Sequence, residues 1–173
     1  EPGIYGPSDI EVVEGSLTIS APDVKLQNTK ISENLLLSSS IGDGSVDLLN
    51  VIVEDTVLVQ GGGEDTIILE DAVINHLVIE RKEAKVRVVL KGNTRIDKVT
   101  ILGEACLSTS DLTEEGAIDE VHIETDADVE LEGDFNAINI TAQEARVTFM
   151  AGQFEVLTTT KEAREAVVIL EDG

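Results

Sequence analysis

Aromatic residues are almost missing from this chain of 173 residues, which contains three Phe, one Tyr and no Trp. Apolar residues still make up 42% of the sequence, so the interior must be built from Val, Ile, Leu and Ala. Val and Ile are β-branched and favour strands. No window sustains the i, i+3, i+4, i+7 apolar spacing of an amphipathic helix. These absences predict an all-β protein with an aliphatic core.

Cysteine is nearly absent too. The single Cys106 excludes an intrachain disulfide framework and a zinc site built from several cysteines. Because no His stands beside it in the sequence, we expect a small buried residue rather than a reactive thiol. No apolar run approaches the ~20 residues that a membrane-spanning helix needs, and no signal peptide is recognisable.

Positive charge is scarce: 12 Lys and Arg stand against 35 Asp and Glu, which gives a formal net charge of −23. Phosphate groups would be repelled by such a surface, so nucleic acid and anionic membranes are not expected partners. Basic partners or metal cations are compatible with the charge. Solubility alone also explains it.

Repetition is what the sequence has in abundance. One six-residue pattern (apolar, turn-like, any, apolar, any, apolar) begins at Ile74, Ile96 and Ile118. A second pattern, Gly-x-Phe, begins at Gly133 and again at Gly152. Repeats of about 20 residues are typical of stacked coils. Each coil holds three short strands with alternating inward aliphatic residues, and neighbouring coils can pair their backbones.

We therefore predict one domain over residues 1–173, a single-stranded, right-handed parallel β-helix of about eight coils of roughly 17–22 residues. Residues 1–15 are expected to cap or cover it. The register places five inward aliphatic residues in one file and stacks Phe135 on Phe154. The file consists of Val57, Leu77, Val99, Val121 and Ile138.

Asn or Asp recurs at one turn, at Asn28, Asn50, Asp71 and Asn93. These residue types tolerate left-handed backbone angles and can bond neighbouring amides, so we expect a stacked ladder. A two-residue Asn turn is typical of right-handed β-helices, which is why we predict that hand. The role indicated for these residues is structural.

Three segments resemble β-helical parts of Gram-positive surface proteins that often carry S-layer-homology anchors: APDVKLQNTKI (21–31), NLLLSSSIGDGSVDLLNVIV (34–53) and GGGEDTIILEDAVI (61–74). The chain also resembles the family 54 carbohydrate-binding module, over residues 2–101 and beyond them only through the repeat. The resemblance implies a secreted, non-catalytic module at the cell surface or cell wall that adheres to polysaccharide. We expect it to be excised from a larger protein with appended enzyme or anchor domains, since a strand-like AVVIL directly precedes the last residues.

Two acidic, glycine-rich loops form the first candidate site. IGDGSVD (41–47) and GGGEDT (61–66) lie one coil apart, so Asp43 should sit over Asp65, with Asp47 and Glu64 nearby. Calcium takes six to eight oxygen ligands, and glycines let the backbone turn its carbonyls towards an ion. These four residues are a candidate calcium site, although no EF-hand loop is present. A solvated acidic edge is the alternative.

The outward side of the third strand of each coil is the second candidate site. Three aliphatic residues are followed there by polar ones, and an exposed patch of this kind can mark a ligand surface. The flat, ridged face suits an extended glycan, but it lacks the aromatic rings on which sugars usually stack. A covering segment, residues 1–15, would explain it equally well. The residues are Leu36, Leu58, Val78, Thr100, His122 and Asn139, with Thr18 and Thr158 at the two ends.

No catalytic constellation stands out: Gly-x-Ser-x-Gly, a phosphate loop and His-Glu-x-x-His are missing. His76 and His122 are about two coils apart and are expected to be solvent-facing. Our leading hypothesis is a non-catalytic module that binds xylan, β-glucan, chitin or cellulose. A structural spacer or S-layer-type domain without ligand is the second hypothesis, and a polysaccharide lyase or hydrolase is the third.

Overall fold

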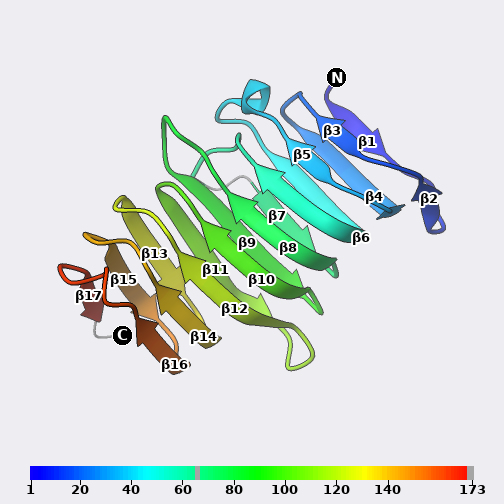
Figure 1. Cartoon of the computed structure of the whole chain (residues 1–173). Helices are drawn as coiled ribbons and strands as arrows, with labels where there is room; N and C mark the ends of the chain where they lie inside the picture. The colour runs from blue at the N-terminus through cyan, green and yellow to red at the C-terminus, as the bar shows by residue number, and fades with distance from the viewer. Residues whose placement is uncertain (65–66, 171–173) are drawn as a thin grey trace.

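The computed structural model describes residues 1–64 and 67–170. Its strands stack as successive coils along one axis, with the N-terminus at one end and the C-terminal strands at the other (Figure 1). The strands are β1 (Gly3–Tyr5), β2 (Glu11–Val13), β3 (Leu17–Ile19), β4 (Val24–Ile31), β5 (Leu35–Leu37), β6 (Val46–Val59), β7 (Ile67–Glu70), β8 (Val73–Ile79), β9 (Val86–Gly92), β10 (Arg95–Ile101), β11 (Ala105–Leu112), β12 (Ala117–Ile123), β13 (Asp128–Glu132), β14 (Phe135–Ile140), β15 (Arg146–Ala151), β16 (Phe154–Thr159) and β17 (Val167–Leu170), and the 3-10 turn η1 covers Ser39–Ile41.

Each coil has three faces, and every strand pairs in parallel with its equivalent in the next coil. The first face contains β1, the start of β4 and of β6, and then β7, β9, β11, β13, β15 and β17. The third face contains β3, β5, the end of β6 and the ends of β8, β10, β12, β14 and β16. The second, narrower face lies between them and begins with β2 against the end of β4.

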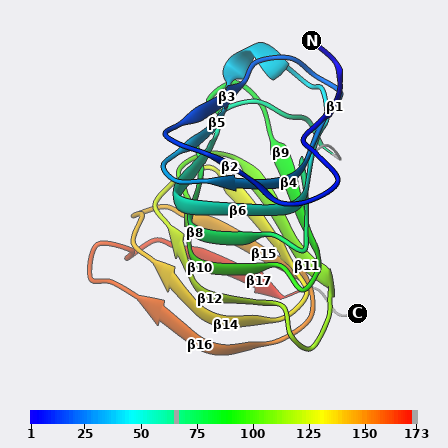
Figure 2. The same ribbon diagram turned by 90° about the vertical axis from the view of Figure 1, so that its right-hand side faces the viewer.

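The chain winds right-handedly through about eight coils, as the sequence predicts (Figure 2). The step between paired residues ranges from 17 positions, for Val121 and Ile138, to 24, for Ala105 and Val129. The longest step exceeds the predicted 22 because the loop after β11 adds residues there.

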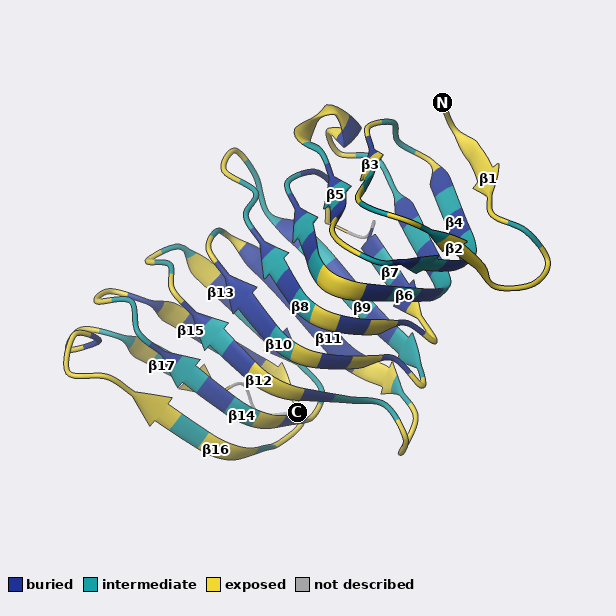
Figure 3. Ribbon diagram, turned by 45° about the vertical axis from the view of Figure 1, so that its right-hand side comes forward, coloured by how far each residue is buried: buried dark blue, intermediate teal, exposed yellow. Residues whose placement is uncertain are grey.

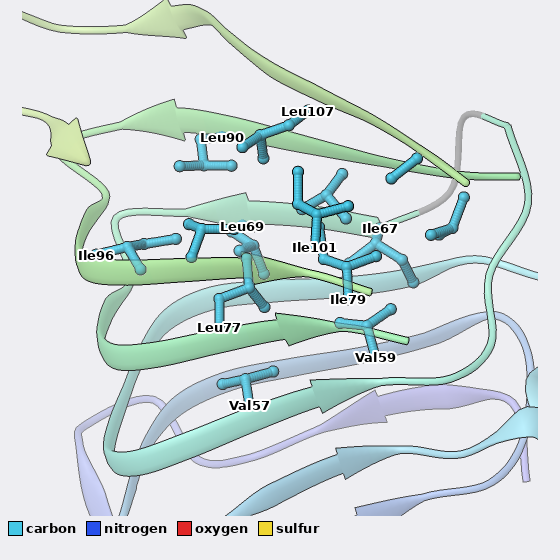
Figure 4. Packing of buried hydrophobic residues seen from close by; sticks show 14 of the residues in the cluster. Val57, Val59, Ile67, Leu69, Leu77, Ile79, Leu90, Ile96, Ile101 and Leu107 are labelled. Atoms are coloured by element: carbon cyan, nitrogen blue, oxygen red, sulfur yellow. The ribbon is translucent and has the colours of Figure 1, made fainter. Parts of the chain in front are cut away.

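The predicted inward file is confirmed. Val57 pairs with Leu77, Leu77 with Val99, Val99 with Val121 and Val121 with Ile138, and all five side chains are buried. Figure 4 shows Val57 and Leu77 in this file beside the parallel file of Val59, Ile79 and Ile101. Burial of each aliphatic side chain contributes roughly 1.5–3 kcal/mol, so the repeated core stabilises a fold that has few aromatic residues.

The left-handed angle expected at the Asn turn is confirmed in three coils and wrong in the fourth, and a side-chain hydrogen bond joins the turn residues of the first two. Asn28, Asn50 and Asp71 have φ angles of 50°, 52° and 52°, and Asn50 Nδ2 donates to Asn28 Oδ1 at 2.8 Å. In the next coil the left-handed residue is Gly92, with φ 60°, because Glu70 pairs with Lys91 and this register aligns Gly92 with Asp71. Asn93 instead donates its backbone N–H to Asp71 Oδ1 at 2.9 Å.

Two further expectations concern the ends of the stack. Phe135 pairs in register with Phe154, as predicted, and Phe154 also contacts Phe149 with ring centroids 4.8 Å apart. At the other end, β1 and β2 both pair with β4, so these two strands within residues 1–15 continue the coil stack.

Candidate functional site

The residues of the predicted outward stripe lie in one continuous register on the third face. Successive members are paired without a break from Thr18 on β3 to Thr158 on β16. Neighbouring members are therefore about 4.8 Å apart along the axis. Figure 3 shows how the burial classes alternate along these strands. The stripe residues are Leu36, Leu58, Val78, Thr100, His122 and Asn139.

The apolar part of the stripe is only half-exposed. Leu36, Leu58 and Val78 are intermediate in exposure, so they form a shallow ridge and not a protruding patch. Thr100 departs from the expectation, because its side chain is buried. His76 of β8 accounts for this, since its Nε2 lies 2.9 Å from Thr100 Oγ1. A ligand on this face would contact His76 before Thr100.

Polar groups gather on the same face in β8, β10 and β12. His76 pairs in register with Lys98, and Lys98 with Glu120, while His122 Nε2 lies 2.7 Å from Glu120 Oε2. Partial burial, with a smaller effect from Lys98, lowers the pKa of His76 below its ordinary value. The hydrogen bond with His122 lowers the pKa of Glu120. The cluster thus presents an imidazole, an ammonium and a carboxylate side by side.

The acidic loops that form the calcium candidate hold a cationic side chain. Arg81 places Nη2 2.5 Å from Asp43 Oδ1, and its Nη1 donates to the carbonyl oxygen of Gly62. Asp47 does not lie in the loop: it is a residue of β6 that pairs with Lys25 and Ile68. The guanidinium of Arg81 therefore places a positive charge beside the carboxylate of Asp43.

Within residues 1–64 and 67–170, no group of three or more His, Cys, Asp or Glu side chains is arranged to hold a metal ion. Glu64 is exposed, and Asp65 lies outside the described residues. The calcium site thus stays a prediction, and Arg81 is the residue that a cation bound at Asp43 would have to displace or accommodate.

An ion-pair cluster on the first face was not anticipated from the sequence. Lys85 Nζ lies 2.5 Å from Glu130 Oε2, and Arg87 Nη2 lies 2.6 Å from Glu132 Oε2. Both pairs join the coil of β9 to the coil of β13 and pass over β11 between them. Burial opposes the charged form of Lys85, but the hydrogen bond and charge of Glu130 outweigh it and raise the pKa of Lys85.

Cys106 lies beneath these two ion pairs. It is buried as expected, but it belongs to the outward side of β11, where it pairs with Arg87 and Glu130 and lies outside the aliphatic core. Burial raises the pKa of the thiol, and the charge of Arg87 offsets this only in part. The signal that could have revealed the cluster is the alternation of Lys85 and Arg87 with Glu130 and Glu132, two coils apart.

A shallow groove of about 590 Å³ runs along the corner between the first and second faces. It is lined by strand ends and loops of three successive coils, and its lining includes Thr113, Asn136, Gln153 and Phe154. Its Asn, Gln and Thr side chains can donate and accept hydrogen bonds. Sequence reasoning missed it because the loops of one corner are brought together only by coil stacking.

In comparisons with known proteins, no protein-family model, no curated protein and no solved structure matches this chain. In the part of the chain that the structure describes, no helix has the length and apolar character needed to cross a bilayer. The parallel pairing of every coil with the next defines the class of this protein, which is a parallel β-solenoid.

Proposed function

We propose that this β-solenoid is a non-catalytic module that binds an extended polysaccharide along its third face. The observation that carries the proposal is the unbroken register from Thr18 to Thr158, which repeats a side chain on a flat face at every coil. A polymer with a repeating unit can make the same contact many times on such a surface. The proposed setting is the cell surface or cell wall, beside enzyme or anchor domains.

The side chains of the third face have the chemistry that a glycan needs. Leu58 and Val78 offer partly exposed aliphatic surface against which the C–H face of a sugar ring can pack. His76, His122 and Asn139 offer hydrogen-bond donors and acceptors to its hydroxyl groups. Single contacts of this kind are weak, and affinity for a polymer comes from repeating them.

The charge of the protein favours a neutral polymer. A net charge of −23 repels the carboxylates of a uronic-acid polysaccharide. Xylan, β-glucan, chitin and cellulose carry little or no charge and fit this restriction. Calcium is not needed for this contact, but it could bridge the acidic surface to a charged glycan.

Pull-down on insoluble xylan, β-glucan, chitin and cellulose, with calcium and with a chelator, tests the proposal. We expect retention on at least one neutral polymer, independent of calcium. Retention on none of them would contradict binding. Release of reducing ends or of unsaturated sugars would show an enzyme instead.

A matched pair of variants locates the contact. Val78→Gln changes the third face and Val89→Gln changes an outward residue of the first face with similar partial exposure; neither alters net charge. We expect Val78→Gln to weaken retention several-fold and Val89→Gln to leave it unchanged. Equal loss in both variants, or in neither, would exclude the third face as the binding surface.

A passive spacer is the second candidate function. It is favoured by the single hydrophobic core, which runs from β3 to β15 and makes the described chain one continuous stack. Such a stack can hold other domains apart without any ligand. If none of the polymers retained the protein in the pull-down, this function would be favoured.

A further inference from the structure

We propose that the groove at the corner between the first and second faces is a separate carbohydrate site, which binds a short, uncharged oligosaccharide. This corner groove is the one of about 590 Å³ whose lining includes Thr113, Asn136 and Gln153. It lies at the start of β12 and β14, whereas the third face lies at their ends. The inference is therefore independent of polysaccharide binding on the third face.

The corner groove has the dimensions of a ligand site and opens sideways. Its volume falls within the roughly 300–1,000 Å³ of small-molecule sites. It is formed where β11, β13 and β15 end and where β12, β14 and β16 begin, so it crosses three coils and about 10 Å of the axis. Because it opens to the side of the stack, coils added before or after these three would lengthen the groove and would not close it.

The shape of the groove follows from two glycines and one long loop. Gly133 lies so close to Thr109, and Gly152 so close to Gly133, that a Cβ atom on either glycine would overlap the preceding coil. The two glycines have φ angles of 98° and 102°, which residues with side chains rarely adopt. The corner is therefore thin at these two coils, whereas the loop of residues 113–116 projects from the coil before them (Figure 1).

Hydrogen bonds within the protein hold both walls of the groove. In the projecting loop, the N–H of Thr113 donates to the carbonyl oxygen of Gly92 at 2.9 Å, and the N–H of Gly116 donates to that of Thr113 at 3.1 Å. In the opposite wall, the N–H of Gln153 donates to Asp134 Oδ1 at 2.9 Å. A site that is already held in its binding shape loses less conformational freedom when a ligand binds.

Three polar side chains of the lining can bond to a ligand. Ser110, Asn136 and Gln153 are exposed, and within residues 1–64 and 67–170 none of their side chains forms a hydrogen bond. A hydroxyl group and two carboxamides both donate and accept, which matches the hydroxyl groups of a sugar. Leu112, half-buried in the same lining, offers an apolar surface to the C–H groups of a sugar ring.

The charge of the lining selects an uncharged sugar. The lining contains Glu114, Asp134 and Glu155 and no Lys, Arg or His, so it repels uronic acids and other anions. All three carboxylates are exposed, so salt screens their attraction for a cation. The hydrogen-bonding side chains are thus the groups that decide which ligand the groove binds.

Chemical-shift mapping of the backbone amides tests the inference, with the 173-residue chain titrated by soluble tetramers cut from xylan, β-glucan, chitin and cellulose. We expect at least one tetramer to shift the amides of residues 109–118 and 133–136. Shifts confined to the third face would overturn the groove and support the proposed function, whereas shifts confined to the groove would support the separate site alone. Shifts in neither region would overturn the inference.

Two groove variants and one matched control identify the contact. Ser110→Ala and Asn136→Ala each remove a polar group of the lining, whereas Asn75→Ala removes an exposed Asn at the equivalent position of an earlier coil. We expect each groove variant to raise the Kd of the tetramer several-fold and Asn75→Ala to leave it unchanged. The same Kd in all three variants would overturn the proposal. Circular dichroism checks that they fold.

The glucosamine tetramer separates sugar recognition from charge, because it is the deacetylated, cationic counterpart of the chitin tetramer. We expect the groove to bind an uncharged tetramer with a Kd that raised salt leaves unchanged. Binding of the glucosamine tetramer alone, lost at raised salt, would show attraction of a cation by the acidic surface and would overturn the proposal.

Discussion

Arg87 and Glu132, 45 positions apart in the sequence, form an ion pair whose Nη2 and Oε2 atoms lie 2.6 Å apart. The residues do not belong to neighbouring coils: β11 lies between β9 and β13. The pair, together with Lys85 and Glu130, therefore joins two coils that share no backbone hydrogen bonds and covers the side chains of the coil between them.

The first prediction concerns the strength of this pair. Both side chains are about 30% exposed, so solvent screens the attraction only in part. A double-mutant cycle with Arg87→Gln and Glu132→Gln should give a coupling of about 0.5–1 kcal/mol in the free energy of unfolding. The more exposed Lys30–Glu54 pair is the control and should give less. Equal coupling energies would refute a special contribution from the pair over β11.

The second prediction concerns the thiol of Cys106. Its burial raises the pKa and excludes reagent, so little thiolate forms near neutral pH. We expect a thiol reagent to label native protein slowly and unfolded protein quickly. Replacing Lys85 and Arg87 by Ala should raise the native labelling rate at least several-fold. An unchanged rate would mean that the ion pairs do not shield the thiol.

The third prediction compares inward and outward residues of one strand. Leu77 is fully buried in the central file, whereas Val78 is half-exposed on the third face. Leu77→Ala should lower the free energy of unfolding by roughly 2–5 kcal/mol, because it leaves a cavity between two coils. Val78→Ala should cost less than about 1 kcal/mol. Denaturant titration measures both, and similar losses would argue against the inward file.

The fourth prediction separates two contributions of Asn50 to stability, its left-handed backbone angle and its side-chain hydrogen bond. This residue has φ 52° and donates to Asn28. Asn50→Gly removes the hydrogen bond but tolerates the angle, whereas Asn50→Ala removes the bond and adds strain of about 1 kcal/mol. We expect the Ala variant to be less stable than the Gly variant in thermal unfolding. A Gly variant less stable than the Ala variant would show that the left-handed angle does not decide which residues this turn tolerates.

The fifth prediction concerns pH. Because the pKa of His76 is lowered in the folded state, the unfolded state binds more protons below the ordinary value of 6.5. Its stabilising effect is present above that pH and is lost as the pH falls through the lowered pKa. Lys98 and His122 favour the lowering, whereas Asp55 and Glu124 oppose it. His76→Gln should therefore lose less stability than the wild type on mild acidification, measured by denaturant titration; an identical loss would contradict the shift.

The register between neighbouring coils could be predicted well from the sequence, because it depends on a local pattern of residues that every coil repeats. Alternating apolar residues specify which side of a strand is buried, and the recurrence of the six-residue pattern at Ile74, Ile96 and Ile118 aligns the coils. The prediction failed at Asn93, where Gly92 takes the left-handed angle. Asn and Gly both suit that conformation, so composition alone could not choose between adjacent residues.

The candidate site was predictable only as a set of positions. Sequence placed Val78, Thr100 and His122 in one file, but it could not show that His76 covers Thr100, because that contact depends on side-chain conformation. For the same reason it could not anticipate that Arg81 binds Asp43 from 38 positions away.

By itself, the sequence determined the parallel coil and its aliphatic interior, since period-two alternation within a repeat of about 20 residues leaves few other ways to bury the apolar side chains. The tertiary structure alone decided which charges meet across coils. Those contacts join residues of different coils through long, flexible side chains, and their partners are set by packing in space and not by local pattern.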